Sequence, residues 1–278
     1  MKNKYLFYLL VVFIGTNVSY ADSLFIAPSY FFTYGNYNNN SSSVSNALYL
    51  TSYLSSRVTL INHYDNLSID LRKDTAYLQN TLHTGFLLNL YPYYFKFHYA
   101  YKQGEYSISD SSLYSDYTNL YSLETMYYQN MILVGLSLTH INSNGILNSN
   151  LLNNQKINQL TLRLDYTFSP SLLFSLKPNY TNLTDGRRLY SVASRITFFP
   201  INSLAIKLFG FAGERAYYFD NDLLTNFNQD ETQKSQIGVQ LDYYPSYYTL
   251  ISAGFQYTKF TSFTINYFFI GIRHGLFI

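Results

Sequence analysis

The side chains of this sequence that could act on a solute are mostly charged, and several recur at a similar distance from successive predicted tight turns. The cations of this set are Arg163, Lys177, Arg195 and Lys207. A row of cations at one depth of a water-filled interior creates a field that favours anions. The pattern therefore predicts electrostatic selection among small solutes, provided that these residues face a common interior.

Further polar residues extend this set on neighbouring segments. They alternate with apolar residues, which places them on one face of an extended chain, and they are Lys96, His98, Glu124, Asp165, Gln240 and Asp242. Two interpretations stay open for the whole set. Either the cations give a modest preference for anions, or the charges pair with one another and no preference results.

His140 and Ser143 are the one pair that could act as a base and a nucleophile. A histidine that activates a serine must lie within hydrogen-bond reach of its hydroxyl. The two residues are three positions apart, so in a regular strand they face opposite ways unless a β-bulge realigns them. The segment is predicted to carry an interfacial histidine before an Asn-Gly loop, with catalysis as the alternative. The five histidines lack metal-ligand spacing, and neither a metal nor a cofactor is expected.

The elements that must position these residues are long strands. Between residues 77 and 102, Leu82, Phe86 and Leu88 fall on one face of an extended chain, and Tyr91-Pro92 then interrupts the pattern. Phe95 and Phe97 resume the apolar face, while Lys96 and His98 take the other. Each segment is long enough to cross a bilayer, which takes roughly 9–11 residues of a tilted strand. The apolar face is therefore predicted to meet lipid and the polar face a lumen.

The same pattern repeats to the end of the chain and predicts about fourteen strands, with twelve to sixteen left open. Tight turns are predicted near residues 55, 91, 129, 169, 200 and 245. Longer polar loops alternate with them, notably 103–117, 142–156 and 213–233. Short turns at one end and long loops at the other are typical of bacterial barrels. No plug is predicted, although residues 213–233 fit both an exposed loop and one that folds inward.

The composition favours a membrane wall. The chain contains 32 tyrosines and 22 phenylalanines, and only 12% of its residues are charged, about half the usual share. Tyrosines cluster beside the tight turns, where aromatic rings suit the membrane interface. Cysteine is absent, which excludes disulfides and a lipidated cysteine. The net charge of +2 is too small to indicate a nucleic-acid partner.

The first residues read as a secretory signal. Lys2 and Lys4 precede an apolar run at 5–15, and Ser19-Tyr20-Ala21 supplies the small residues of a cleavage site. This order is typical of a signal peptide. The predicted organisation is a signal peptide at 1–21 followed by a single β-barrel at 22–278.

With these features the chain resembles a Gram-negative outer-membrane β-barrel protein, and in size and strand pattern it is similar to the monomeric fourteen-stranded porins. The final strand keeps the alternation of the assembly signal of such proteins, although Phe277 is only next to last. The resemblance implies the cell outer membrane, contact with lipid and lipopolysaccharide, and insertion by the barrel assembly machinery. Residues 140–145 also resemble the histidine–serine motif of outer-membrane phospholipase A, whose spacing is two residues instead of three.

The sequence thus predicts a porin-like channel for passive diffusion of small hydrophilic solutes or ions, without enzymatic activity. Two alternatives remain. One is a phospholipase-like hydrolase that uses His140 and Ser143, and the other is a non-conducting barrel for adhesion or envelope assembly.

Overall fold

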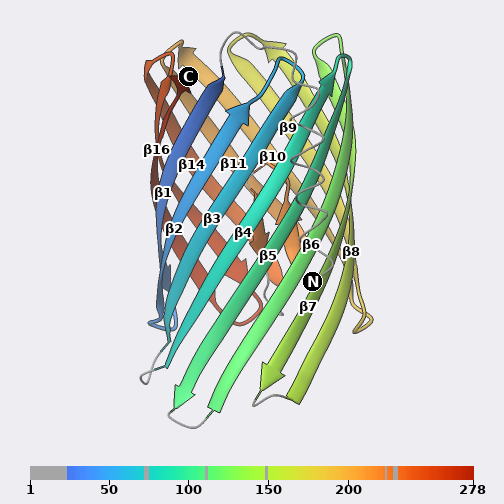
Figure 1. Ribbon diagram of the computed structural model, residues 1–278, viewed down its shortest axis with the longest axis vertical. Coiled ribbons are helices and arrows are strands. Elements are labelled where there is room, and N and C mark those ends of the chain that lie inside the picture. Colours follow the sequence, from blue (N-terminus) through green and yellow to red (C-terminus); the bar gives the residue numbers. More distant parts are fainter. Residues whose placement is uncertain (1–23, 72–74, 110–111, 148–149, 223, 228–230) are drawn as a thin grey trace.

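A computed structural model describes residues 24–71, 75–109, 112–147, 150–222, 224–227 and 231–278. The described residues form a closed antiparallel barrel of fourteen strands (Figure 1). None of them belongs to a helix that could cross a membrane. The predicted signal peptide, 1–21, lies outside the described residues.

The barrel strands follow one another around the wall in chain order. They are β1 (Phe25–Tyr37), β2 (Ser42–Tyr53), β3 (Val58–Leu71), β4 (Thr75–Leu90), β5 (Tyr93–Ser109), β6 (Ser112–Gln129), β7 (Ile132–Leu147), β8 (Asn150–Ser169), β9 (Leu172–Leu183), β10 (Arg188–Ile201), β11 (Leu204–Arg215), β14 (Gln233–Ser246), β15 (Thr249–Phe260) and β16 (Thr264–His274). The short β17 (Leu276–Phe277) continues β16. The short strands β12 (Tyr218–Asp220) and β13 (Thr225–Phe227) form a separate hairpin.

The first and last strands close the sheet. β1 pairs with β16 from Ser29 opposite Arg273 to Tyr37 opposite Ile265, and Phe25 pairs with Phe277 of β17. A hydrocarbon environment offers no partner for backbone N–H and C=O groups, so a spanning sheet must be closed. Around the described wall, the antiparallel ladder meets this requirement.

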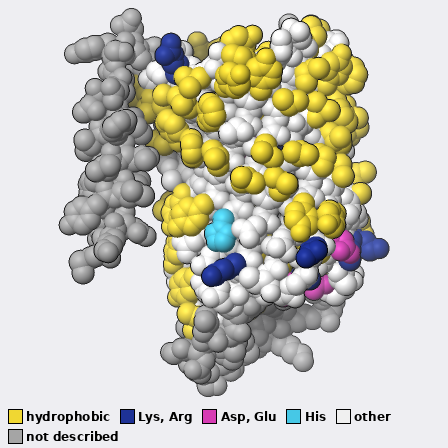
Figure 2. Space-filling model, turned by 90° about the vertical axis from the view of Figure 1, so that its right-hand side faces the viewer, with side chains coloured by type: hydrophobic (Ala, Val, Ile, Leu, Met, Phe, Trp, Pro, Cys, Tyr) yellow, Lys and Arg dark blue, Asp and Glu magenta, His cyan; other side chains and the backbone are white. Residues whose placement is uncertain are grey.

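The side chains of the wall are arranged inside out relative to a soluble protein. On β7, Leu138 is 55% exposed while Ser137 is 2% exposed, and on β8 Leu162 is 50% exposed while Thr161 is 8% exposed. Figure 2 shows apolar side chains spread over the wall, with charged side chains near its two ends. An apolar exterior and a polar interior are the arrangement of a barrel that faces lipid.

Aromatic side chains also project outward near the tight turns. Tyr91, Tyr93 and Tyr247 are 71%, 53% and 91% exposed. Tyr91 opens the turn between β4 and β5, and Tyr247 lies in the turn between β14 and β15. Such rings suit the headgroup boundary, because their body is apolar and their hydroxyl can stay hydrated.

The predicted tight turns fall at or beside the observed ones, but two predicted long loops are wrong. Strand β5 continues to Ser109 before β6 begins at Ser112, and β7 continues to Leu147 before β8 begins at Asn150. Residues 103–117 and 142–156 are thus mostly strand. Cross-strand hydrogen bonding overrides the low strand propensity of Asn, Ser and Gly there. Figure 1 shows β4 to β8 reaching beyond the other strands at the end away from the C-terminus.

The sequence leaves two conformations open for residues 213–233, an exposed loop and one that folds inward, and the structure shows the inward one for residues 216–222 and Leu224. There Tyr217, Phe219 and Leu224 are buried. They share an apolar cluster with inward side chains of five adjacent strands, β6 to β10: Leu120, Ile141, Ile157, Leu183 and Leu189. Burial of this apolar surface favours the inward conformation over an exposed loop.

A single charged substitution on the wall can test whether the apolar exterior faces lipid. Leu162→Arg should lower the free energy of unfolding by about 2–4 kcal/mol, because the cation would face the middle of the hydrocarbon. Tyr247→Arg, at the turn end, should cost about 0–1 kcal/mol. Urea unfolding of barrels folded into lipid vesicles measures both values. Equal costs at the two positions would contradict a lipid-facing Leu162.

Candidate functional site

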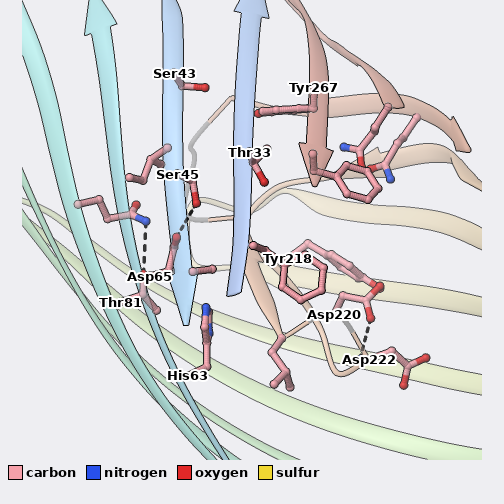
Figure 3. A pocket seen from close by; sticks show the side chains of 18 of the residues that line it. Thr33, Ser43, Ser45, His63, Asp65, Thr81, Tyr218, Asp220, Asp222 and Tyr267 are labelled. Atoms are coloured by element: carbon pink, nitrogen blue, oxygen red, sulfur yellow. Dashed lines mark hydrogen bonds between the residues drawn. The ribbon is translucent and has the colours of Figure 1, made fainter. Parts of the chain in front are cut away.

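The inward segment divides the lumen. Residues 216–222 with Leu224, called the lumen hairpin below, lie against the wall formed by β4 to β10. Beside it remains a cavity of about 940 Å³. Its lining includes Asn39, between β1 and β2, and Leu250 and Arg273, near the opposite ends of their strands. The cavity thus extends along the barrel beside the hairpin. Figure 3 shows some of the side chains that line it, among them Tyr218, Asp220 and Asp222 of the hairpin.

One half of the hairpin's attachment is apolar and strand-like. Phe219 is 1% exposed, and its ring centroid lies 6.0 Å from that of His83 and 5.7 Å from that of His98. The Phe219 backbone N–H donates to Oε1 of Gln159 (3.0 Å), and Nε2 of Gln159 donates to the Phe219 carbonyl (2.9 Å). The Gln159 side chain therefore satisfies both backbone groups of a buried residue, as a neighbouring strand would.

The other half is ionic. Asp222 accepts hydrogen bonds from Nζ of Lys177 (2.5 Å) and from the guanidinium of Arg163, and Nζ of Lys96 lies 3.4 Å away. Glu124 completes the network, with its carboxylate 2.9 Å from Nε of Arg163 and 3.4 Å from Nζ of Lys96. Cations from three strands, β5, β8 and β9, thus surround the carboxylate of Asp222.

Neutral hydrogen bonds add to the ionic contacts beside Asp222. Nδ2 of Asn221 donates to Oγ of Ser137 (2.7 Å), and Oγ of Ser122 donates to Oδ1 of Asn221 (3.2 Å). These contacts reach β6 and β7, which lie between the strands that carry the cations. The tip of the hairpin is therefore bound to every strand from β5 to β9.

The ionisation of Asp222 follows from these neighbours. Removal from solvent opposes the charged form, but Lys177, Arg163 and Lys96 outweigh it and hold the pKa of the carboxyl well below its usual range. Lys177 likewise helps to hold the pKa of Asp220 below its usual range, against the opposing effect of burial. Both carboxylates are therefore charged at neutral pH, and their ion pairs persist into mild acid.

The residues predicted to line the pore fall into two groups. Lys96, Glu124, Arg163, Asp165 and Lys177 meet around Asp222. Lys207, Gln240 and Asp242 form a second cluster, in which Nζ of Lys207 lies 2.5 Å from Oδ2 of Asp242 and Nε2 of Gln240 donates to Oδ1 (2.7 Å). Arg195 lines the cavity, whereas His98 is covered by Phe219.

The pairing interpretation of these charges fits this geometry better than the anion preference. Five cationic and five acidic residues are among the described residues that line the cavity: Lys102, Lys177, Arg195, Arg215 and Arg273, and Asp65, Asp116, Asp220, Asp222 and Glu231. From the sequence, Asp220 and Asp222 are expected to be acids of a solvated loop, because the loop has the composition of an exposed one, and their position in the lumen is not predicted. The signal that could have revealed them is the apolar residue at an inward position on each of β6 to β10, which calls for a covering partner.

The structure separates His140 from Ser143. His140 is exposed, with Nδ1 2.9 Å from Oδ1 of Asn158, whereas Ser143 is buried and accepts a hydrogen bond from Oγ1 of Thr118 (3.0 Å). The β7 register is regular through both residues, and its irregularity follows Gly145. The bulge that catalysis would need is not between them, so this geometry gives no support to the hydrolase alternative. In the described part of the chain, no group of three His, Cys, Asp or Glu residues is arranged to hold a metal.

The closed fourteen-stranded wall, its apolar exterior and its polar, partly filled lumen define the fold of an outer-membrane β-barrel. The fold and the lipid-facing wall together are those of a protein of the cell outer membrane. The lumen hairpin is the feature that distinguishes its interior from an open cylinder.

Comparison with known proteins supports this class through structure alone. No family model matches the sequence, and no curated protein matches it. The CymD monoaromatic hydrocarbon channel is similar in fold, with 9% identity, a TM-score of 0.60, and coverage of 94% of this chain and 91% of that one. CdiB from Acinetobacter baumannii shows 12% identity and a TM-score of 0.57, and the match covers 90% of this chain and 60% of CdiB.

A third similar structure is a loop-deletion mutant of OmpT, an outer membrane protein of Vibrio cholerae. It shows 8% identity and a TM-score of 0.52, with coverage of 91% of this chain and 99% of that one. At these identities the likeness shows a shared fold.

The ionic half of the hairpin's attachment can be tested by neutralising one carboxylate. Asp222→Asn should weaken the attachment by about 3 kcal/mol, because Arg163 and Lys177 would lose a shared partner in a largely buried site. The hairpin should then leave its position more often. Single-channel recording should show a higher or more variable conductance. Asp185→Asn, which breaks the exposed pair with Arg187, is the matched control and should leave the current unchanged. Equal currents from Asp222→Asn and the unsubstituted protein would contradict this role of Asp222.

Proposed function

We propose that this protein is a passive channel for small hydrophilic solutes, and that the cavity beside the lumen hairpin is the route. The observation that carries this proposal is a cavity whose lining includes residues from both ends of the barrel, although the hairpin occupies part of the lumen. The hairpin narrows the lumen, so the route admits small solutes. Polar side chains such as Gln236, Gln240 and Gln256 line it, which favours hydrated solutes.

The charges along the route support weak ion selectivity. Cationic and acidic residues line the cavity in equal number, so their fields oppose each other over short distances. The anion preference considered from the sequence alone needs the cations to stay unpaired, and Lys177 is paired with both Asp220 and Asp222. CymD is a monoaromatic hydrocarbon channel, so a protein of this fold can serve as a channel, but at 9% identity the likeness adds nothing about the solute. We further propose that the wall contacts outer-membrane lipid and lipopolysaccharide, and that the barrel assembly machinery inserts it.

Conductance in a planar bilayer tests the proposal. The purified protein should give discrete current steps that scale linearly with voltage, and its reversal potential across a salt gradient should lie near zero. Vesicles that contain it should swell in small sugars, while vesicles with heat-denatured protein should not. An absence of current and swelling would favour a non-conducting barrel for adhesion or envelope assembly. A large reversal potential of either sign would overturn weak selectivity while leaving the channel intact.

A further inference from the structure

Among the aromatic side chains that line the cavity is a set of five on barrel strands outside β4 to β10, and one of these five, Tyr49, also packs against the apolar cluster of the lumen hairpin. They come from β11, β16, β1, β2 and β3 and are called the aromatic arc: Phe209, Phe269, Phe31, Tyr49 and His63. Phe31 and Tyr49 meet edge to face, with centroids 5.6 Å apart. Tyr49 and His63 stack with centroids 4.1 Å apart and planes 6° apart. Three of these rings, Phe31, Tyr49 and His63, therefore pack in a row across β1, β2 and β3.

Glycines on neighbouring strands hold three of these rings against the wall. A Cβ atom built on Gly271 would lie 2.2 Å from Phe31, one on Gly254 would lie 2.2 Å from Phe269, and one on Gly238 would lie 2.5 Å from Phe209. Each ring therefore occupies the space that a side chain would take. A ring seated in this way lies along the wall and leaves the cavity open beside it.

Polar groups stand close to the rings. Arg195 is directly opposite Phe209 in the register of β10 and β11, and Gln240 is opposite Gly254, on which the Phe269 ring rests. Across the cavity, the hairpin presents Tyr218, Asp220 and Asp222, as Figure 3 shows. A solute in the route would therefore meet flat apolar rings on one side and hydrogen-bonding groups on the other.

We propose that the aromatic arc is a binding site for a small molecule that carries a planar aromatic ring with polar substituents. The cavity volume of about 940 Å³ falls within the range of small-molecule sites. Aromatic rings attract one another in offset-stacked and edge-to-face arrangements beyond simple area burial, and rings held by glycine lose little freedom when a ligand stacks on them. This inference rests on the proposed channel, because it names one class of solute that the channel would bind along its route. Its test is equilibrium binding, which needs no conduction.

Indole is a suitable probe because the chain contains no tryptophan, so indole emission can be excited apart from the protein's tyrosines. Purified barrel in detergent and in lipid vesicles should give a saturable change in indole emission above the partitioning seen without protein. Benzyl alcohol should displace indole at about one tenth of the concentration needed for cyclohexylmethanol, its saturated counterpart, because only an aromatic ring gains the stacking contribution. Methyl glucoside should displace little.

A substitution pair locates the site. Phe31→Leu combined with Phe269→Leu keeps apolar bulk but removes two rings, and it should weaken indole binding about tenfold. Phe268→Leu is the matched control, because Phe268 is the neighbour of Phe269 on β16 but points outward and is 52% exposed. It should leave binding unchanged. Gel mobility with and without heating verifies that each variant is folded.

Several outcomes would overturn the site. Non-saturable indole emission, equal displacement by benzyl alcohol and cyclohexylmethanol, or displacement by methyl glucoside at the same concentration would each do so. The solute comparison uses unsubstituted protein, so it decides the matter even if the double variant does not fold. Binding without conductance would reject the channel and keep the site, whereas conductance without binding would reject only the site.

Discussion

The structure depends on one constraint, the pairing of every backbone N–H and C=O group that faces hydrocarbon. A sheet meets this constraint only when its last strand returns to its first, as β16 does on β1. Closure then determines which side chains face lipid and which face the lumen. Leu138 and Leu162 must face lipid, so their neighbours Ser137 and Thr161 face inward. A charge that the strands carry at an inward position consequently has water or another lumen residue as its partner.

The lumen hairpin supplies many of those partners. Asp222 is shared by cations on β5, β8 and β9, and Phe219 covers apolar side chains that would otherwise face water inside the barrel. The same segment therefore has two effects. It compensates the charge of these cations, and it covers the apolar side chains of the adjacent wall. Elsewhere in the lumen, three rings of the aromatic arc lie against the wall, because Gly238, Gly254 and Gly271 leave room for them.

Alternation of residue types was sufficient to predict the membrane class and a barrel of about fourteen strands. Arg163 and Lys177 were placed inward by this rule alone, and the contacts of both lie there. The rule failed where tertiary structure decides. Asn- and Ser-rich stretches of β5 to β8 remain strand because a partner strand continues beside them. Asp222 belongs to a segment whose composition also suits an exposed loop, and its distance from Lys96 becomes defined only when the sheet has curved into a barrel.

The position of the hairpin along the chain has a consequence for biogenesis. All the strands on which it packs, from β4 to β10, precede it in sequence, and only β14, β15 and β16 follow. A nascent sheet that ends at β11 carries Lys96, Arg163 and Lys177 with Glu124 and Asp165 as their nearest acids, and it still lacks Asp220 and Asp222. Charge compensation in this part of the lumen therefore depends on residues that come late in the chain, after the strands that carry the cations. A barrel in which the β1–β16 seam sealed before this segment entered would enclose surplus cations and an uncovered apolar surface.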